Sequence, residues 1–239
     1  MSLFAAFLKL VRWPNLVFIV LTQVLFYSCI YVPLYQQTDL SFLVWIIIAS
    51  VCIAAGGNVI NDYFDLNIDQ INKPEKNVIN SIISRRWAIF WHMLLSLAGI
   101  FATAMAVGFM KWYIVFANIF CVLLLWFYST SFKRQLLIGN VIISLLTSWA
   151  VLILFYAHVP FDAAFNSNDL VITKFFRLSF LYGGFAFVIS LVREAIKDIE
   201  DRRGDEQYGC NTLPIFAGLR ATKIYITVWV IVLIAALLI

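Results

Sequence analysis

Long stretches without a charged side chain recur along this chain, and they limit the folds that it can adopt. A helix needs about 20 apolar residues to cross the hydrocarbon core of a membrane. The charged residues leave five windows long enough to span, a shorter sixth and a seventh that reaches the last residue: 13–38, 40–61, 87–110, 112–132, 135–161, 178–192 and 224–239. Only 13% of the residues are Asp, Glu, Lys or Arg, against about 25% in soluble domains. We therefore predict an all-α, multi-pass transmembrane helical bundle with seven spans, formed by residues 1–239 as a single domain.

The first and sixth windows need separate interpretation. The first is too long for the apolar core of a cleaved signal peptide, so we expect it to be the first span. Its helix is expected to give way to a loop from Val32, and Pro33 and Pro160 are expected to mark helix ends. The sixth window is short for a span, so we expect its helix to continue into the polar segment Arg193–Arg203. That continuation would place the acidic residues of the segment near the membrane edge.

Basic residues are unevenly divided between the two sets of connecting segments. The N-terminus and the segments after the second, fourth and sixth windows together carry 14 of the 17 Lys and Arg residues. Cytoplasmic loops of membrane proteins are enriched in these residues. We therefore predict an integral membrane protein of the cell inner membrane, with its N-terminus and these basic segments on the cytoplasmic side.

The four cysteines and two histidines form no recognisable site in the sequence. The cysteines are scattered without a pairing or metal-binding pattern, which supports neither a zinc site nor a disulfide framework. His92 and His158 each stand alone in an apolar stretch, and we interpret both as packing residues.

Ten of the 13 acidic residues fall in two clusters, one after the second window and one after the sixth. Four crossings separate the clusters, so both return to the same face of the membrane. The acids of each cluster recur at intervals of three or four residues, which places them on one helical face, where they repel one another. Mg²⁺ offsets such repulsion and is commonly held by one or two carboxylates plus substrate phosphate. We predict these magnesium ligands: Asp62, Asp65, Asp69, Asp198, Asp201 and Asp205.

Both clusters resemble motifs of the UbiA superfamily of intramembrane prenyltransferases. Residues 61–69 match that family's NDxxDxxxD motif in full, and residues 198–214 resemble its second aspartate motif. Residues 128–129, followed by Lys133, are similar to the family's tyrosine–lysine segment. Residues 12–15 are similar to its usual entry to the first helix. These matches occur in the expected order and on the expected side of the membrane.

The resemblance implies two Mg²⁺ ions that bridge both aspartate motifs to a prenyl diphosphate. The diphosphate ionises at its C1–O bond, and a lipophilic acceptor attacks the allylic cation. The implied catalytic residues are Asp65, Asp201 and Asp205. The implied diphosphate-binding residues are Asn61, Lys73, Lys76, Tyr128, Lys133 and Lys197.

The second motif is most similar to the digeranylgeranylglyceryl phosphate synthase branch of the family. That branch transfers geranylgeranyl to geranylgeranylglyceryl phosphate in ether-lipid biosynthesis. The implied partners are a prenyl diphosphate, a lipophilic acceptor and the lipid bilayer, with no nucleic acid. Other members that share both motifs prenylate an aromatic quinone precursor or haem, and this alternative stays open.

The chain departs from the family pattern in two respects. The family usually has nine transmembrane helices, so with seven spans the chain is either a shortened member or lacks its C-terminal helices. Lys76 stands where the family tends to have arginine, and a lysine is a point charge without a bidentate fork.

Functions from other classes compete with prenyl transfer. A catalytically inactive membrane protein is one alternative. A divalent-cation transporter is another, but it would place carboxylates near the bilayer middle. The first, third, fourth, fifth and seventh helices are expected to contain no internal charge, and the aspartates are expected at helix ends or in loops, which disfavours such a path. A membrane alcohol phosphotransferase would carry a D-G-x-x-A-R signature, which is absent from the sequence.

Overall fold

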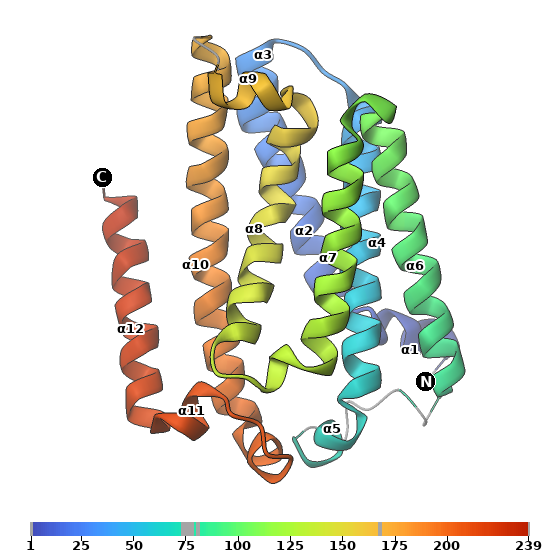
Figure 1. Cartoon of the computed structure of the whole chain (residues 1–239), viewed down its shortest axis with the longest axis vertical. Coiled ribbons are helices and arrows are strands. Elements are labelled where there is room, and N and C mark those ends of the chain that lie inside the picture. Colours follow the sequence, from blue (N-terminus) through green and yellow to red (C-terminus); the bar gives the residue numbers. More distant parts are fainter. Residues whose placement is uncertain (1, 73–78, 80–81, 167–168, 239) are drawn as a thin grey trace.

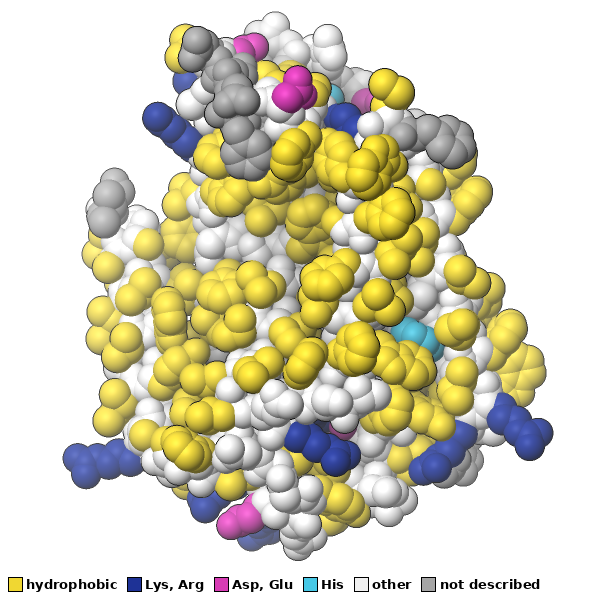
Figure 2. Space-filling view, in the orientation of Figure 1, with side chains coloured by type: hydrophobic (Ala, Val, Ile, Leu, Met, Phe, Trp, Pro, Cys, Tyr) yellow, Lys and Arg dark blue, Asp and Glu magenta, His cyan; other side chains and the backbone are white. Residues whose placement is uncertain are grey.

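The chain folds into a bundle of long helices in a computed structural model that describes residues 2–72, 79, 82–166 and 169–238. Seven of the described helical segments are long and apolar enough to cross a membrane, which confirms the predicted number of spans. They are formed by α2 with its continuation (Trp13–Tyr35), α4 (Leu40–Phe64), α6 (Arg85–Val107), α7 (Trp112–Thr130), α8 (Ile138–His158), α10 (Leu170–Gln207) and α12 (Gly218–Leu237). An apolar band covers the middle of the face shown in Figure 2, with Lys and Arg side chains concentrated toward its lower end.

Short helices mark the two ends of the bundle (Figure 1). At one end lie α1 (Leu3–Leu10), α5 (Leu66–Asn72) and α11 (Leu213–Phe216). We call this the site end, because it holds both acidic clusters. The opposite end carries α3 (Val32–Tyr35) and α9 (Phe161–Asn166). The prediction that both clusters lie on one face is therefore confirmed.

The sixth span is longer than its apolar window. α10 has 38 residues and runs from Leu170 to Gln207. At 1.5 Å per residue it is about 57 Å long, which exceeds the roughly 30 Å hydrocarbon core. The predicted continuation into Arg193–Arg203 is confirmed, and one rigid helix carries the second acidic cluster.

The loop predicted from Val32 is wrong, because the first span stays helical to Tyr35. A π-helical turn (Tyr27–Tyr31) precedes α3, and Pro33 lies in the first turn of α3. Proline is tolerated in a first turn, where its missing N–H has little effect on the hydrogen-bond ladder. Pro160 does follow a helix end, since α8 stops at His158.

Two central helices, α4 and α6, pack closely through glycines. The His92 Nδ1 atom lies 3.0 Å from the Gly56 carbonyl oxygen of α4. A Cβ atom added at Gly99 would lie 2.6 Å from Ile53 Cγ1 and 3.1 Å from the Ala49 carbonyl oxygen. Small residues allow this close approach, which drives helix association in membranes.

Gly99→Ala is expected to lower the free energy of unfolding by about 1–3 kcal/mol, because the added methyl overpacks the α4–α6 contact. Gly184→Ala on α10 is the matched control, since a Cβ there meets no atom within 4 Å. The measurement is thermal unfolding of both variants in detergent. Equal melting temperatures for Gly99→Ala and the wild type would contradict the close packing of α4 on α6.

The last helix stands apart from the rest of the bundle. α12 packs against α10 and α11, and Figure 1 shows it to one side of the other spans. Among its described residues, Thr222 is the one that is buried. α12 therefore contributes little to the walls of the site end.

Candidate functional site

The first acidic cluster begins inside a transmembrane helix and crosses its end. Asn61 and Asp62 lie in the last turn of α4, Asp65 caps that helix, and Asp69 lies in α5. The Asp65 N–H donates to the Asn61 carbonyl at 2.9 Å, and the Asp69 N–H donates to the Asp65 carbonyl at 2.8 Å. The helical spacing predicted for this cluster is therefore kept across the junction of two helices.

Basic residues from distant segments pair with these carboxylates. An Arg12 Nη atom lies 2.5 Å from Asp62 Oδ1, and the Lys133 ammonium group forms an ion pair with Asp65 Oδ2. Burial alone would lower the pKa of Lys133, but Asp65 and Tyr128 outweigh it and the pKa is raised. For Arg12 burial acts in the same direction, and Asp62 outweighs it to raise the pKa. Both cations stay charged at neutral pH.

Asp69 is in a different electrostatic environment. Burial, followed by repulsion from Asp65 and Asp62, raises the pKa of Asp69 to about 6. Asn61 donates from Nδ2 to Asp65 Oδ2 at 2.7 Å, while its side-chain oxygen Oδ1 is buried with no hydrogen-bond partner among the described residues. A crowded carboxylate and a buried acceptor oxygen beside it are groups that a hard cation would stabilise.

The second cluster is arranged on α10 with its carboxylates pointing in different directions. Asp198 accepts a hydrogen bond from Asn140 Nδ2 of α8 at 2.8 Å. Asp205 is buried. Asp201 lines a cavity of about 710 Å³ at the site end, which is described below as the outer cavity.

Asn72 joins the two clusters. Its Nδ2 atom donates to the Asp201 carbonyl at 2.8 Å, and its Oδ1 atom accepts from the Gly204 N–H at 2.7 Å. A Cβ at Gly204 would lie 2.6 Å from the Asn72 amide nitrogen, so only glycine permits this contact without a shift. The end of α5 is thereby held against α10.

An outer cavity of about 710 Å³ opens between the N-terminal segment and α10. Apolar residues of α1 and α2 form part of its wall, including Leu8, Trp13 and Pro14. The polar lining that the sequence predicted consists of Asn61, Asp62, Asp65, Asp69, Lys133, Lys197 and Asp201. The fold therefore gathers residues from four segments of the chain around one space.

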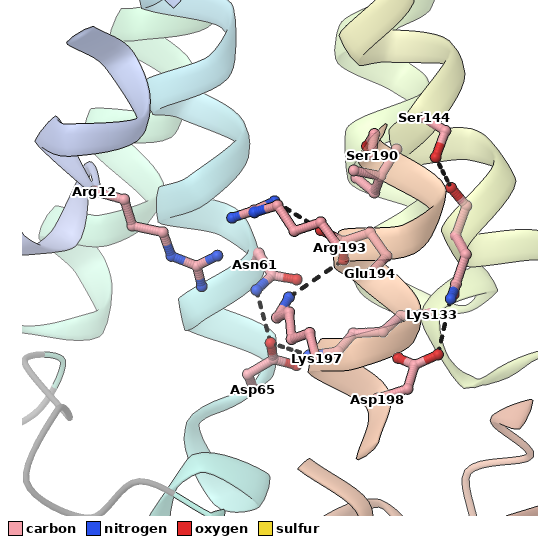
Figure 3. Close-up of polar contacts among 12 residues, drawn as sticks. Arg12, Asn61, Asp65, Lys133, Ser144, Ser190, Arg193, Glu194, Lys197 and Asp198 are labelled. Carbon is pink, nitrogen blue, oxygen red and sulfur yellow. Dashed lines mark hydrogen bonds and ion pairs between the residues drawn. The ribbon is translucent and has the colours of Figure 1, made fainter. Parts of the chain in front are cut away.

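A smaller inner cavity of about 70 Å³ extends along α4 to Gly57, one helical turn before Asn61. Gly57, Leu125 and Ile143 form its apolar side, and the predicted residue Tyr128 lines it. Its remaining lining is Arg12, Asn15, Asn58, Asn61, Arg193, Glu194 and Lys197. Figure 3 shows the ion pairs and hydrogen bonds around this space.

The structure does not bring every predicted residue to the cavities. The side chains of Asp198 and Asp205 line neither of them. Lys73 and Lys76 lie outside the described residues. Among the described residues, no three His, Cys, Asp or Glu side chains converge as a metal-binding group. Mg²⁺ commonly completes its shell with water and substrate phosphate, and such a site needs only one or two carboxylates.

Several residues at the site were not predicted as functional. Arg12 was identified from the sequence only as part of the entry to the first helix. Its position as a basic residue at the site end of a span could have indicated a role in anion binding. Glu194 lies four residues before Asp198 and extends the acidic spacing by one turn. The contacts of Asn72 and Asn140 were not predicted, because their partners lie more than 50 residues away in sequence.

Comparison with known proteins places this architecture in a family. The model of the UbiA prenyltransferase family matches residues 24–239. The chain belongs to this family. The helical bundle and its apolar spans are therefore those of a UbiA-family membrane protein.

Curated relatives include digeranylgeranylglyceryl phosphate synthases from two archaea. The protein of Methanosphaera stadtmanae is 34% identical over 181 residues, which cover 73% of this chain and 58% of the relative. The protein of Methanothermobacter thermautotrophicus is 34% identical over 186 residues, which cover 75% of this chain and 58% of the relative. The matches thus span 58% of the length of these relatives.

Two solved structures share the fold. A structure concerned with digeranylgeranylglyceryl phosphate synthase in membranes has a TM-score of 0.69 and 23% identity, with 99% of this chain and 76% of that one covered. A UbiA homolog from Archaeoglobus fulgidus bound to GPP and Mg²⁺ has a TM-score of 0.67 and 16% identity, with 97% and 76% covered. At these identities the likeness concerns the fold.

Proposed function

We propose that this chain is a Mg²⁺-dependent prenyltransferase that moves a prenyl group from a prenyl diphosphate to a lipophilic acceptor. The observation that carries this proposal is the meeting of both aspartate motifs at one cavity, where Asn72 ties them together. The structure of the Archaeoglobus fulgidus homolog with GPP and Mg²⁺ supports the same chemistry in a protein of this fold.

In this proposal the carboxylates of both motifs would hold Mg²⁺, with two ions expected, and the metal would supply Lewis-acid chemistry toward the diphosphate. The proposed ligands are Asp62, Asp65, Asp69, Asp198, Asp201 and Asp205. Asp65, Asp69 and Asp201 line the outer cavity directly. The buried side-chain oxygen Oδ1 of Asn61 is a further oxygen ligand that the same cavity offers.

Positive side chains bind the diphosphate and stabilise the charge that develops on it. Lys133 and Lys197 line the outer cavity, and Tyr128, whose hydroxyl can donate a hydrogen bond, lines the inner one. When the C1–O bond breaks, its electron pair leaves with the diphosphate, and these fixed donors stabilise that charge. The oxygen of an acceptor hydroxyl then forms the new bond to C1, and its proton leaves with the diphosphate.

The acceptor that best fits the relatives is geranylgeranylglyceryl phosphate, with geranylgeranyl diphosphate as donor. The curated relatives at 34% identity are digeranylgeranylglyceryl phosphate synthases. Prenylation of an aromatic quinone precursor or of haem is the competing reaction. The site end carries most of the basic residues, so we propose that it faces the cytoplasm.

The test is diphosphate release from geranylgeranyl diphosphate by the purified chain in detergent with Mg²⁺. Geranylgeranylglyceryl phosphate and an aromatic acceptor are compared in parallel. We expect release coupled to ether-lipid product with the glycerol phosphate. Release only with the aromatic acceptor would keep the reaction and overturn the acceptor. No release with either, in protein shown to be folded, would contradict the proposed activity.

A further inference from the structure

Arg193 lies where the apolar part of α10 gives way to its polar part. It directly follows the apolar window 178–192 and lies one turn before Lys197. Its side chain is 54% exposed, yet it lines both the inner and the outer cavity. In Figure 3 its guanidinium extends from α10 toward Arg12, which projects from the opposite wall. The proposed roles in metal and diphosphate binding leave this arginine without a function.

A buried carboxylate holds Arg193 in place. An Nη atom of Arg193 lies 2.8 Å from Glu194 Oε1, and the ammonium group of Lys197 lies 3.6 Å from Glu194 Oε2. Glu194 is 5% exposed. A guanidinium has five N–H donors in a fixed fork. Among the described residues, the guanidinium of Arg193 donates to Glu194. The remaining donors are available to a ligand in the cavity.

The two cavities differ in the balance of charge on their walls. The inner cavity is lined by three bases, Arg12, Arg193 and Lys197, and by one acid, Glu194. The outer cavity shares these three bases and adds two lysines and five carboxylates: Lys9, Lys133, Asp62, Asp65, Asp69, Glu200 and Asp201. A metal ion fits the carboxylates. The excess of bases around Arg193 favours an anion in addition to the diphosphate.

The surroundings of Arg193 indicate what kind of anion this is. Ile196 of α10 and Trp13 and Pro14 of α2 line the same outer cavity as Arg193. In Figure 1, α2 lies near α10 at the opposite end of the bundle and diverges from it toward the site end. The side chains of Val17 on α2 and Ile189 on α10 are exposed. A ligand there would have an anionic head and an apolar body.

We propose that Arg193, positioned by Glu194, binds the phosphate of a phosphomonoester lipid that serves as the acceptor. This inference rests on the proposed prenyl transfer and names the acceptor's class and the residue that selects it. The planar guanidinium suits a phosphate, which it can contact with two parallel hydrogen bonds. Arg193 and Lys197 are one helical turn apart, about 5–6 Å along the axis. Acceptor phosphate and diphosphate would therefore lie side by side.

The test measures binding and needs no turnover. The purified full-length chain in a neutral detergent is titrated with 1-oleoyl lysophosphatidic acid, a glycerol phosphomonoester with one chain. Monoolein, which has the same chain and glycerol but no phosphate, is titrated in parallel, and inorganic diphosphate with Mg²⁺ forms a third arm. Trp13 lines the outer cavity, so tryptophan fluorescence can report all three.

We expect Arg193→Gln to weaken lysophosphatidic acid binding by about tenfold, the change expected for the loss of a charge-assisted hydrogen bond. Monoolein and Mg²⁺–diphosphate binding should be unchanged. Arg193→Lys should show an intermediate loss, because it keeps the charge and loses the fork. Glutamine can still donate to Glu194, which favours retention of the fold.

Arg203→Gln is the matched control, since Arg203 lies exposed on the same helix and lines neither cavity. It should leave all three ligands unaffected. An equal loss of Mg²⁺–diphosphate binding in Arg193→Gln would assign the arginine to the diphosphate and overturn the proposal. Equal wild-type affinity for lysophosphatidic acid and monoolein would also overturn it. Phosphate-selective binding in a chain that shows no prenyl transfer would instead contradict the proposed function alone.

Discussion

Asp65→Asn is expected to reduce prenyl transfer by on the order of 10³-fold, the size of effect seen when a group that stabilises transition-state charge is removed. Asp65 is at the centre of the site, because its carboxylate accepts from Asn61 and pairs with Lys133. Asparagine keeps the shape of the side chain and loses the charge that a divalent cation needs. The measurement is the initial rate of product formation at saturating geranylgeranyl diphosphate.

The same substitution leaves Lys133 without its carboxylate partner, which lowers stability as well as activity. Asp201→Asn is therefore measured beside it, because that change leaves the Lys133–Asp65 ion pair intact. Asp162→Asn on α9, at the opposite end of the bundle, is the matched control and should retain full activity. A monodisperse elution profile shows that each variant is folded. Wild-type rates in either Asp65→Asn or Asp201→Asn would rule out a mechanism that uses both motifs.

The number and kind of spans could be predicted because the membrane imposes a simple length requirement. Charge-free windows of about 20 residues have few other stable arrangements. Parity of the crossings then placed both acidic clusters at one end. The end of the first span was missed at Val32, because a proline after a π-helical turn does not stop the helix. A local sequence pattern does not reveal that turn.

The directions in which the side chains of the second acidic cluster point could not be predicted from their spacing alone. Successive residues of a helix are about 100° apart, so a residue seven positions on lies about 20° from the starting direction and a residue three positions on lies about 60° from it. Asp198 and Asp205 share one face, and Asp198 contacts Asn140 of α8. Asp201 is rotated toward the outer cavity. Packing of α10 on α8 decides which of these faces meets the substrate.

The sequence also did not reveal which residues from distant segments pair with the carboxylates of the site. The pairs Arg12–Asp62 and Lys133–Asp65 join residues that are 50 and 68 positions apart. Asn72 donates to the carbonyl of Asp201 on α10, which is 129 positions away in sequence. These contacts give the carboxylates different partners: Asp62 pairs with Arg12 and Asp65 pairs with Lys133. The motif supplies the carboxylates, and the tertiary fold assigns their roles.

Removal of divalent cations is expected to abolish transfer, with a loss of at least about 10³-fold, and addition of Mg²⁺ should restore it. The carboxylates of Asp62, Asp65 and Asp69 are crowded at the junction of α4 and α5, and burial with this repulsion raises the pKa of Asp69 to about 6. A bound cation relieves the repulsion, so diphosphate binding in EDTA should weaken together with transfer. The measurement is product formation after dialysis against EDTA and after graded addition of Mg²⁺, with Ca²⁺ in parallel as a larger ion that tolerates less regular geometry. Undiminished transfer in EDTA, in protein shown to be metal-free, would mean that Lys133, Arg12 and Lys197 alone stabilise the leaving diphosphate, and the carboxylates would then need another explanation.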